Sequence, residues 1–543
     1  MNRNEILGSL KNQSPSVLII GGGINGAGTF RDLALNGVDV LLIDRADFCS
    51  GASAASSHMA HGGIRYLENG EFRLVREAVG ERNRMIKNAP HLVRPLPTTI
   101  PIFKFWSGLL NAPLKFLGWL DNPSERGAFV IKVGLMLYDA YTKAQGTVPP
   151  HRFEGKDASH KRFSELHPEI RYTATYYDGS ILSPERYTVE LILDAEAESP
   201  HARALNYVSL IGIDGKNVIL KDELTGETYQ ANPTLIINAA GPWIDRVNTD
   251  LGLAHQYIGG TKGSHLVLNH PELREAIGEN EFFFENKDGR IVLVFPLLDE
   301  VIIGTSDIPI ENPDDARCTE EEVDYFFEMI GHVFPNIKLK HEQIVFRFSG
   351  VRPLAYSDAK TTGQITRDHS IKEDVLDDIP VYSLVGGKWT SYRAFSEQVT
   401  DRALKFLGKP RTADTMNLAV GGGRDYAVMK DSSECDAQLF ARYGSRCREV
   451  EAHQNAGDDV PLNHYPEMTH REVSFLAEKE KVVHLDDLIL RRSLMAYLGH
   501  LNRPLIDELA DILAQVLGWS GVRKKEEVER TLDILQENHG VNF

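Results

Sequence analysis

A run of glycines follows an apolar segment near the start of the chain. Residues 17–20 read Val-Leu-Ile-Ile, and residues 21–28 read Gly-Gly-Gly-Ile-Asn-Gly-Ala-Gly. A strand that turns through glycines into a helix lets backbone N–H groups approach a pyrophosphate, and the helix dipole favours the negative charge there. A second apolar segment, residues 38–43, ends at Asp44, about 20 residues on, where an acidic side chain accepts ribose hydroxyls. The pattern predicts a dinucleotide site in an α/β fold.

The hydroxyl-rich loop after Asp44 favours FAD over NAD. Residues 49–58 are small and rich in serine, where a nicotinamide-binding domain would continue into another strand and helix. Hydroxyls and amides in such a loop can donate to the phosphate and ribityl oxygens of a cofactor lying along it. The alternative is a flexible serine-rich linker. Residues 235–243 form another buried-type strand that ends in small residues, which suits close backbone approach to the same cofactor.

Size and charge limit the function classes. The 543 residues suffice for two or three domains, and a hydrophobic content of 42% can supply their cores. The formal net charge of −18 argues against nonspecific nucleic-acid binding as the main task. Residues 1–14 lack the apolar core of a secretory signal, and no uncharged apolar run long enough to cross a bilayer follows, so no membrane span is expected.

Cysteine spacing gives no sign of a disulfide framework or a metal site. Cys49, Cys318, Cys435 and Cys447 are scattered along the chain without CxxC or His/Cys metal spacing. Such usage is typical of a protein in a reducing compartment. We therefore expect a cytoplasmic location.

An aromatic segment offers a way to reach lipid without a membrane span. Residues 102–120 include Phe103, Phe105, Trp106 and Trp119 with two lysines. This composition suits an element that lies in a bilayer interface, with Trp at headgroup depth and Lys reaching outward. We expect peripheral attachment to the inner face of the cytoplasmic membrane; core packing or a homodimer contact is the alternative.

The middle of the chain contains scaffold signals. Two β-rich runs, residues 291–296 and 301–304, flank a short polar turn and predict a hairpin. Thr319 and Glu322 have the spacing of a capping box, which predicts a helix running to about Ile330.

The last part of the chain is mostly helical in pattern. Thr469 and Glu472 repeat the capping-box spacing. One apolar face between Pro504 and Gly518 consists of Leu505, Leu509, Ile512, Leu513 and Val516. We predict that residues 418–543 form a separate helical C-terminal cap. Residues 1–417 would combine a dinucleotide-binding domain with an interleaved substrate domain, the latter mainly at about 90–180 and 262–375.

Several basic residues lie in turn-like settings between predicted strands. Each one alone is an ordinary surface cation. Together, Arg65, Arg352, Arg367 and Lys388 would build an anion site and hold a phosphate by charge-assisted bonds, despite the acidic net charge.

Eight segments spread along the chain carry a family resemblance. They are IIGGGINGAG, HGGIRYLENGEFRLVREA, APHLV, NAAGPW, KGSH, SGVRPL, ITRDHS and GGKWTSYR, in this order. With LDDLILRR near the C-terminus, they resemble the FAD-dependent glycerol-3-phosphate dehydrogenases, within the glycine and D-amino-acid oxidase type of flavoproteins. The resemblance runs from about Val17 through the final helices.

The resemblance implies a fold and a reaction. The fold would be α/β, with a Rossmann-like FAD-binding domain, an interleaved β-rich substrate domain and an α-helical C-terminal domain. The enzyme would oxidise the C2 alcohol of sn-glycerol 3-phosphate to dihydroxyacetone phosphate. Electrons would pass from noncovalent FAD to a membrane quinone, or to oxygen in the oxidase branch.

The resemblance also places six residues at the substrate. They are Arg65, Tyr66, His265, Arg352, Arg367 and Lys388. His265 is the candidate base, because a neutral imidazole with a pKa near the working pH can take the hydroxyl proton. Arg352 would stabilise charge on the reacting oxygen, since a guanidinium pKa above about 12 excludes it as a base. Arg65, Arg367 and Lys388 are assigned to the phosphate.

The residues expected to bind FAD lie in these segments, at the end of the second apolar segment, in the hydroxyl-rich loop and at Val208. They are Gly21, Gly23, Ile24, Asn25, Gly26, Asp44, Arg45, Ser53, Ser56, Ser57, His61, Gly62, Gly63, Val208, Ala240, Gly241, Gly387, Lys388, Trp389 and Thr390. A covalent link would need a His or Cys beside the flavin ring, and Cys49 is a candidate.

Two departures from the family pattern keep other substrates open. Ala52 and His58 stand where the family usually has threonine and lysine. Another polyol phosphate, such as erythritol phosphate, is therefore an alternative substrate. An oxidase that releases peroxide and a flavin protein without turnover are alternative functions, although a structural flavin needs no converging cations.

Overall fold

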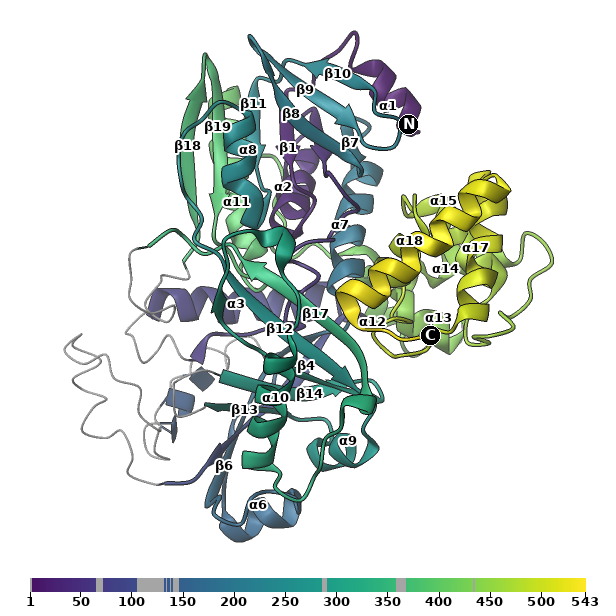
Figure 1. The fold of residues 1–543 in the computed structure, drawn as a ribbon. Helices are drawn as coiled ribbons and strands as arrows, with labels where there is room; N and C mark the ends of the chain where they lie inside the picture. The colour runs from purple at the N-terminus through teal and green to yellow at the C-terminus, as the bar shows by residue number, and fades with distance from the viewer. Residues whose placement is uncertain are drawn as a thin grey trace.

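The computed structural model describes residues 2–64, 72–104, 131–132, 134–136, 138–139, 146–285, 291–357, 368–432 and 435–543. Figure 1 shows a six-stranded sheet in the upper part of the molecule and a ten-stranded sheet in the lower part. The C-terminal helices, drawn in yellow and light green, lie to one side of both.

The six-stranded sheet is mostly parallel. Its order is β18 (Ser370–Leu376), β19 (Ile379–Val385), β11 (Leu235–Asn238), β1 (Val17–Ile20), β2 (Val40–Ile43) and β7 (Ala202–Leu205). Only the β18–β19 pairing is antiparallel. All four residues of β1 are buried, as in parallel strands covered on both faces.

Alternate residues of β1 enter two different cores. Val17 and Ile19 pack with α2 (Ile24–Leu35), α7 (Pro184–Glu198) and α11 (Tyr392–Leu407). Leu18 and Ile20 pack on the other face. The elements there are α1 (Arg3–Ser9), α8 (Ile244–Asp250), and a three-stranded sheet of β8 (Val208–Asp214), β9 (Asn217–Asp222) and β10 (Thr228–Ala231).

The ten-stranded sheet contains the strands from the predicted substrate-binding segments. Its main path is β16 (Ile308–Pro309), β12 (Thr261–Leu268), β15 (Glu300–Gly304), β14 (Ile291–Leu297), β13 (Glu281–Glu285), β4 (Val93–Ile102), β6 (Tyr172–Ile181) and β3 (Met59–Ala60). Off this path, β17 (Ile344–Arg352) pairs with β12 and β5 (Arg152–Gly155) pairs with β6. The helices beside this sheet are α3 (Phe72–Asn88), α6 (Lys156–Arg162), α9 (Pro271–Ile277) and α10 (Glu320–Val333).

Two local predictions in this sheet are confirmed. The strands β14 and β15 form the expected antiparallel hairpin, closed at the Leu297–Glu300 pair. Helix α10 starts with a complete capping box between Thr319 and Glu322 and ends at Val333, three residues beyond the expected end.

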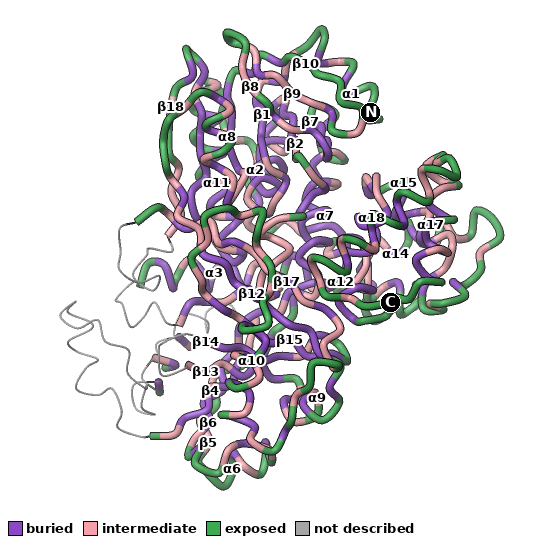
Figure 2. The backbone as a smooth tube through the Cα atoms, viewed as in Figure 1, coloured by how far each residue is buried: buried purple, intermediate pink, exposed green. Residues whose placement is uncertain are grey.

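The C-terminal region is helical, as expected. Its helices are α12 (Tyr426–Met429), α13 (Ala437–Tyr443), α14 (Cys447–Gln454), α15 (His470–Lys479), α16 (Leu485–Asp487), α17 (Arg503–Leu517) and α18 (Gly521–His539), with a π-helical turn η8 (Leu488–Arg492). Short 3-10 turns occur in this region at Gly421–Gly423 and Gly444–Arg446, and earlier in the chain at Gly241–Trp243, Pro313–Asp315 and His341–Gln343. Figure 2 shows the inner faces of α15 and α17 buried and their outer faces exposed.

The predicted apolar face of α17 is confirmed, and the second capping box is half right. Leu505, Leu509, Ile512 and Leu513 are buried, while Val516 is partly exposed. Thr469 accepts the backbone N–H of Glu472, as predicted. The Glu472 carboxylate instead accepts bonds from Arg442 and Tyr443, and the hydroxyl of Tyr443 is a buried donor that needs an acceptor.

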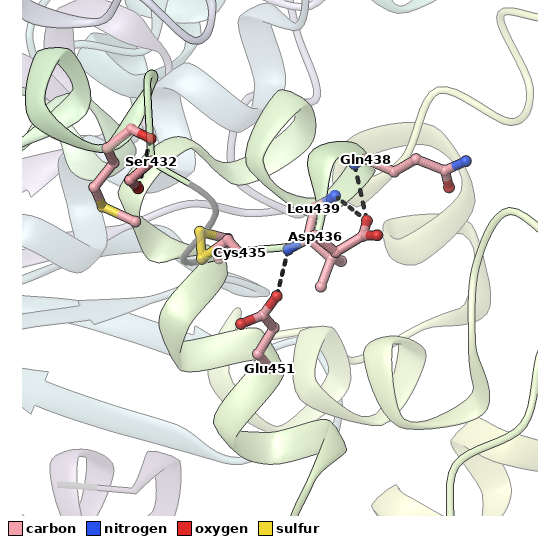
Figure 3. Close-up of a disulfide and its surroundings, with 8 residues drawn as sticks. Ser432, Cys435, Asp436, Gln438, Leu439 and Glu451 are labelled. Carbon is pink, nitrogen blue, oxygen red and sulfur yellow. Dashed lines mark hydrogen bonds between the residues drawn. A yellow bond between two sulfur atoms is a disulfide. The ribbon is translucent and has the colours of Figure 1, made fainter.

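One prediction from cysteine spacing is wrong. Cys435 and Cys447 form a disulfide, with their Cα atoms 6.3 Å apart (Figure 3). Cys447 begins α14, and the turn between α13 and α14 brings it back to Cys435, two residues before α13. Asp436, next to Cys435, caps α13 by accepting the N–H groups of Gln438 and Leu439. A twelve-residue spacing carries no such information, so cysteine usage no longer argues for a reducing compartment.

Among the described residues, no helix is long and apolar enough to cross a bilayer. Residues 105–130, which hold most of the aromatic segment, lie outside the described part of the chain. Phe103 packs beside the core of the ten-stranded sheet.

Candidate active site

A large cavity lies where the two sheets and the C-terminal helices meet. Its volume is about 1160 Å³, above the range of about 300–1,000 Å³ typical of small-ligand pockets. Thirteen of the predicted cofactor residues line it: Gly21, Gly23, Ile24, Asn25, Asp44, Arg45, Ser53, Val208, Ala240, Gly241, Gly387, Lys388 and Trp389. The cavity is therefore the candidate dinucleotide site.

The glycine turn between β1 and α2 has no room for a side chain at Gly21 or Gly26. Gly21 has φ +108°, and a Cβ there would lie 2.6 Å from the carbonyl oxygen of Ala239. A Cβ at Gly26 would collide with the carbonyl of Gly21, so Gly26 serves the packing of the turn and does not line the cavity. Gly23 is the N-cap of α2 and supplies no side-chain cap. The first turn of α2 thus opens toward the cavity, a cradle that suits a pyrophosphate.

Asp44 stands where the sequence predicts, at the end of β2. Its carboxylate accepts the backbone N–H groups of Gly22 at 2.7 Å and Ala46 at 2.9 Å. Burial raises the pKa of Asp44 to about 6, although these two hydrogen bonds act to lower it. Next to it, Arg45 pairs with Asp314 at 2.6 Å and lies over the ring of Trp243.

The hydroxyl-rich loop is packed in place and is not a free linker. Ser53 Oγ accepts the N–H of Ile24, in the first turn of α2, at 3.0 Å. The indole N–H of Trp389 donates to the carbonyl of Ser53 at 2.9 Å. The loop therefore joins the start of α2 to the segment before α11.

The segment before α11 depends on glycine geometry. Gly386 and Gly387 have φ +78° and +100°, and a Cβ on Gly387 would lie 2.7 Å from Asn25 Nδ2. This conformation presents Lys388 and Trp389 to the cavity. Thr390 does not line it; its hydroxyl donates to the carbonyl of His61 at 3.1 Å.

Five further predicted residues support the site from outside the cavity. They are Ser56, Ser57, His61, Gly62 and Gly63. Gly62 donates its N–H to Asp178 at 2.8 Å, and a Cβ there would collide with the hydroxyl of Tyr138. Ser57 shares a hydrogen bond with His265. Cys49 is also absent from the lining; its thiol is buried and contacts the carbonyl of Pro184.

His265 is held as a buried ring on β12. It lies opposite Phe348 of β17, and the two rings stack at 4.7 Å with 6° between their planes. Nε2 is 2.8 Å from Ser57 Oγ, while Nδ1 has no hydrogen-bond partner among the described residues. Burial, and then the positive charge of Arg352, lower the pKa of His265 well below its ordinary value. The ring is therefore neutral at neutral pH.

The Arg352 side chain lies on the same face of the β12–β17 pair as His265. Its guanidinium passes over Gly263, where a Cβ would collide with it. Nη1 is 3.1 Å from Asp307 Oδ1, and Nη2 donates to Thr305 Oγ1 at 2.9 Å and to the carbonyl of Ser306 at 3.0 Å. These contacts aim a fixed positive charge toward His265.

Three predicted substrate residues cannot be placed. Arg65, Tyr66 and Arg367 lie outside the described residues. Lys388 is placed, and it lines the cavity. The two family departures differ: Ala52 lines the cavity, whereas His58 is buried beside Phe348 and Tyr497 and does not.

The contribution of the C-terminal region to the cavity was not predicted from the sequence. Among the lining residues from that region are His484, Asp486, Arg491, Tyr497 and His539. One sequence feature could have indicated it: two arginines directly follow the apolar run Leu-Ile-Leu at 488–490. Arginines next to such a buried-type run need carboxylate partners inside the protein.

Comparison with known proteins gives the family. Residues 16–376 match the model of the FAD dependent oxidoreductases, and residues 383–524 match the C-terminal domain of alpha-glycerophosphate oxidase. A glycerol-3-phosphate dehydrogenase of Synechocystis sp. is 31% identical over 97% of this chain and 98% of its own length. An aerobic glycerol-3-phosphate dehydrogenase of Staphylococcus aureus is 27% identical over 99% and 98%.

A solved structure shares the fold. The glycerol-3-phosphate dehydrogenase of Bacillus halodurans, complexed with FAD, aligns with a TM-score of 0.75 at 22% identity over 98% of this chain and 97% of that one. The predicted fold class, an FAD-binding fold with a helical C-terminal domain, is confirmed. The chain belongs to the FAD-dependent oxidoreductases, in the family of the glycerol-3-phosphate dehydrogenases.

Proposed function

We propose that this protein oxidises sn-glycerol 3-phosphate to dihydroxyacetone phosphate, using FAD bound in the cavity. The relatives named above act on this substrate by name. One structural observation supports the reaction: a buried, neutral His265 lies beside a fixed Arg352 on the same face of the β12–β17 pair. A base and a cation so arranged suit the removal of a proton from an alcohol.

The chain has the residues to hold FAD. The first turn of α2 and the N–H groups of the glycine turn would bind the pyrophosphate, Asp44 the ribose, and the loop around Ser53 the ribityl chain. FAD held there would supply an acceptor for the hydride that leaves C2 of the substrate. Cys49, the cysteine that the sequence offers for a covalent link, does not line the cavity.

Two residues would handle the reacting alcohol. His265 would take the C2 hydroxyl proton at Nε2, where the substrate hydroxyl would replace Ser57 Oγ as the hydrogen-bond partner. Arg352 would stabilise the negative charge that develops on the same oxygen and would hold the ketone formed from it. The bonds from Arg352 to Thr305 and Ser306 fix its position in advance, so little reorganisation is needed.

The phosphate would bind to cations at the edge of the site. Lys388 lines the cavity, and the resemblance adds Arg65 and Arg367. Phosphate binding by several cations would hold C2 in one orientation, which is how remote binding energy is used in catalysis.

Two electron acceptors, a quinone and oxygen, are compatible with this reaction. We propose a quinone and peripheral attachment to the inner face of the membrane, through the aromatic segment that starts at residue 102. The match of residues 383–524 to an oxidase domain favours oxygen as the second candidate. An assay of substrate-dependent peroxide, with and without a quinone, separates the two. Sedimentation with liposomes tests the attachment.

The substrate itself is tested by anaerobic titration of the flavin absorbance. Glycerol 3-phosphate should bleach the flavin, and erythritol phosphate should do so less efficiently. A stronger response to erythritol phosphate would assign the enzyme to that polyol. No bleaching by any polyol phosphate would leave a flavin protein without this activity.

A further inference from the structure

A buried cluster of charges joins the C-terminal region to the dinucleotide-binding part of the chain. It consists of three carboxylates, Asp47, Asp486 and Asp487, and two guanidiniums, Arg491 and Arg492, while the exposed Arg530 pairs with Asp486 at its edge. The Asp47 carboxylate is fully buried. Such a group is stable inside a protein only when it is paired and hydrogen-bonded.

The two arginines of η8 supply that pairing. Arg492 binds both oxygens of Asp47, at 2.8 and 3.0 Å, and Arg491 Nε donates to it at 2.6 Å. Asn206 adds a fourth bond at 2.9 Å. Burial alone would raise the pKa of Asp47, but Arg492 and Arg491 hold it below its ordinary value. The carboxylate thus stays ionised and locked in one position.

Asp47 lies in the loop that supports the glycine fingerprint. In this loop, Asp44 accepts the N–H of Gly22, and the N–H of Cys49 donates to the carbonyl of Gly22 at 3.0 Å. Phe48 lies directly under Gly22, where a Cβ would collide with its ring. A shift at Asp47 would therefore disturb the contacts that hold Gly22, in the middle of the glycine turn.

We propose that Arg491 and Arg492 are positioning residues for FAD. Through Asp47 they hold the loop of residues 44–49 against the glycine turn, so the C-terminal helical region sets how tightly the cofactor binds. Arg491 also lines the cavity, as does Asp47 itself. The inference rests on the FAD site proposed above and adds to it a part of the chain more than 400 residues away in sequence.

A nearby ion pair provides a matched control. Arg186 of α7 binds Glu480 through two bonds, at 3.0 and 2.8 Å, and both side chains are buried. This pair joins α7 to the same C-terminal region, and Arg186 also donates to the main-chain carbonyl of Arg492 at 3.3 Å. Among the described bonds, none made by the Arg186 side chain reaches the loop of residues 44–49. The pair therefore reports on docking of the C-terminal region, including the backbone of η8, without the charge contact between Arg492 and Asp47.

The test is the rate at which purified holoenzyme releases FAD after dilution, followed by flavin fluorescence. Arg492→Met should speed release at least about tenfold, because breaking a buried ion pair costs more free energy than a factor of ten represents. Arg186→Met should release FAD at close to the wild-type rate, even where its melting temperature falls. An unchanged rate in Arg492→Met, or equal acceleration in Arg186→Met, would overturn the proposal.

A milder variant covers the case in which Arg492→Met does not fold. Asp47→Asn keeps the shape of the side chain and, at Oδ1, the bonds from Asn206 and Arg492 Nη2; it removes the charge and puts an amide N–H₂ group where Arg491 and Arg492 donate to Oδ2. Faster release from this variant supports the positioning role, and wild-type release contradicts it. A wild-type protein that binds no FAD would instead refute the cofactor site itself.

Discussion

His265 Nε2 and Ser57 Oγ lie 2.8 Å apart and join strand β12 to the hydroxyl-rich loop. The loop also caps the first turn of α2 through Ser53. One short segment therefore connects the candidate base with the candidate pyrophosphate site. This connection explains why a serine-rich stretch is held rigidly between two sheets.

The pKa of His265 predicts the acidic limb of the pH profile. Burial and Arg352 place that pKa well below 6.5, so the ring stays neutral as the pH falls through 6.5. The acidic limb of kcat/KM should lie below pH 6.5 in wild type. A limb at or above 6.5 would contradict a buried neutral base.

Ser57→Ala, which removes the bond to Nε2, should lower kcat while FAD is retained.

Arg352→Ala tests charge stabilisation at the reacting oxygen. Loss of one preorganised donor typically lowers kcat by about 10² to 10³. The variant should keep its flavin, because Arg352 does not line the dinucleotide cavity. Arg352→Lys serves as the matched control and should recover part of the loss. Near-normal turnover of the alanine variant in stopped-flow flavin reduction would exclude the role.

Gly23→Val tests the cradle at the start of α2. Gly23 has φ −75°, which valine can adopt, so the chain should fold. A Cβ there lies only 3.0 Å from Ser53 Oγ, and the larger side chain would occupy the space left for the pyrophosphate. The purified variant should be a folded, colourless apoprotein with wild-type circular dichroism. Stoichiometric flavin in this variant would show that the pyrophosphate binds elsewhere.

Buried histidines make stability depend on pH. Burial lowers the pKa of His58 and of His539 to about 4. Both are neutral when folded and protonate when unfolded, so their contribution is complete above pH 6.5 and is lost as the pH falls toward 4. Each histidine changes the free energy of unfolding by up to about 1.4 kcal/mol per pH unit in that window.

His539→Phe isolates one of these groups. The variant loses the bond to the carbonyl of Arg347, which lowers stability at every pH, but it keeps the stacking on Phe346. Its melting temperature should fall less steeply than that of wild type between pH 6.5 and 4. Parallel curves would mean that His539 does not titrate on unfolding.

Local sequence patterns predicted the local structure well. The glycine turn, Asp44 at the end of β2, the β14–β15 hairpin and the cap at Thr319 all follow from spacing within a few residues. Contacts between distant segments were not readable in this way. The disulfide of Cys435 depends on a turn between two helices, and the partners of Arg492 lie at the other end of the chain. Only the folded topology brings such residues together.

The fold also decides which predicted site residues touch the cavity. Ser56 and Ser57 follow the lining residues in sequence, but the chain leaves the cavity there to enter β3, and His61 follows β3, so none of the three lines the cavity. Strand pairing placed His265 beside Phe348 and Arg352 on one face, whereas the sequence showed only three separate motifs.

Anaerobic reduction of the flavin by glycerol 3-phosphate and by glycerol tests the central claim most directly. If cations bind the phosphate and orient C2, glycerol 3-phosphate should bleach the flavin rapidly and glycerol should do so far more slowly. Equal reduction by the two compounds, or no reduction by glycerol 3-phosphate, would contradict the proposed substrate and the anion site.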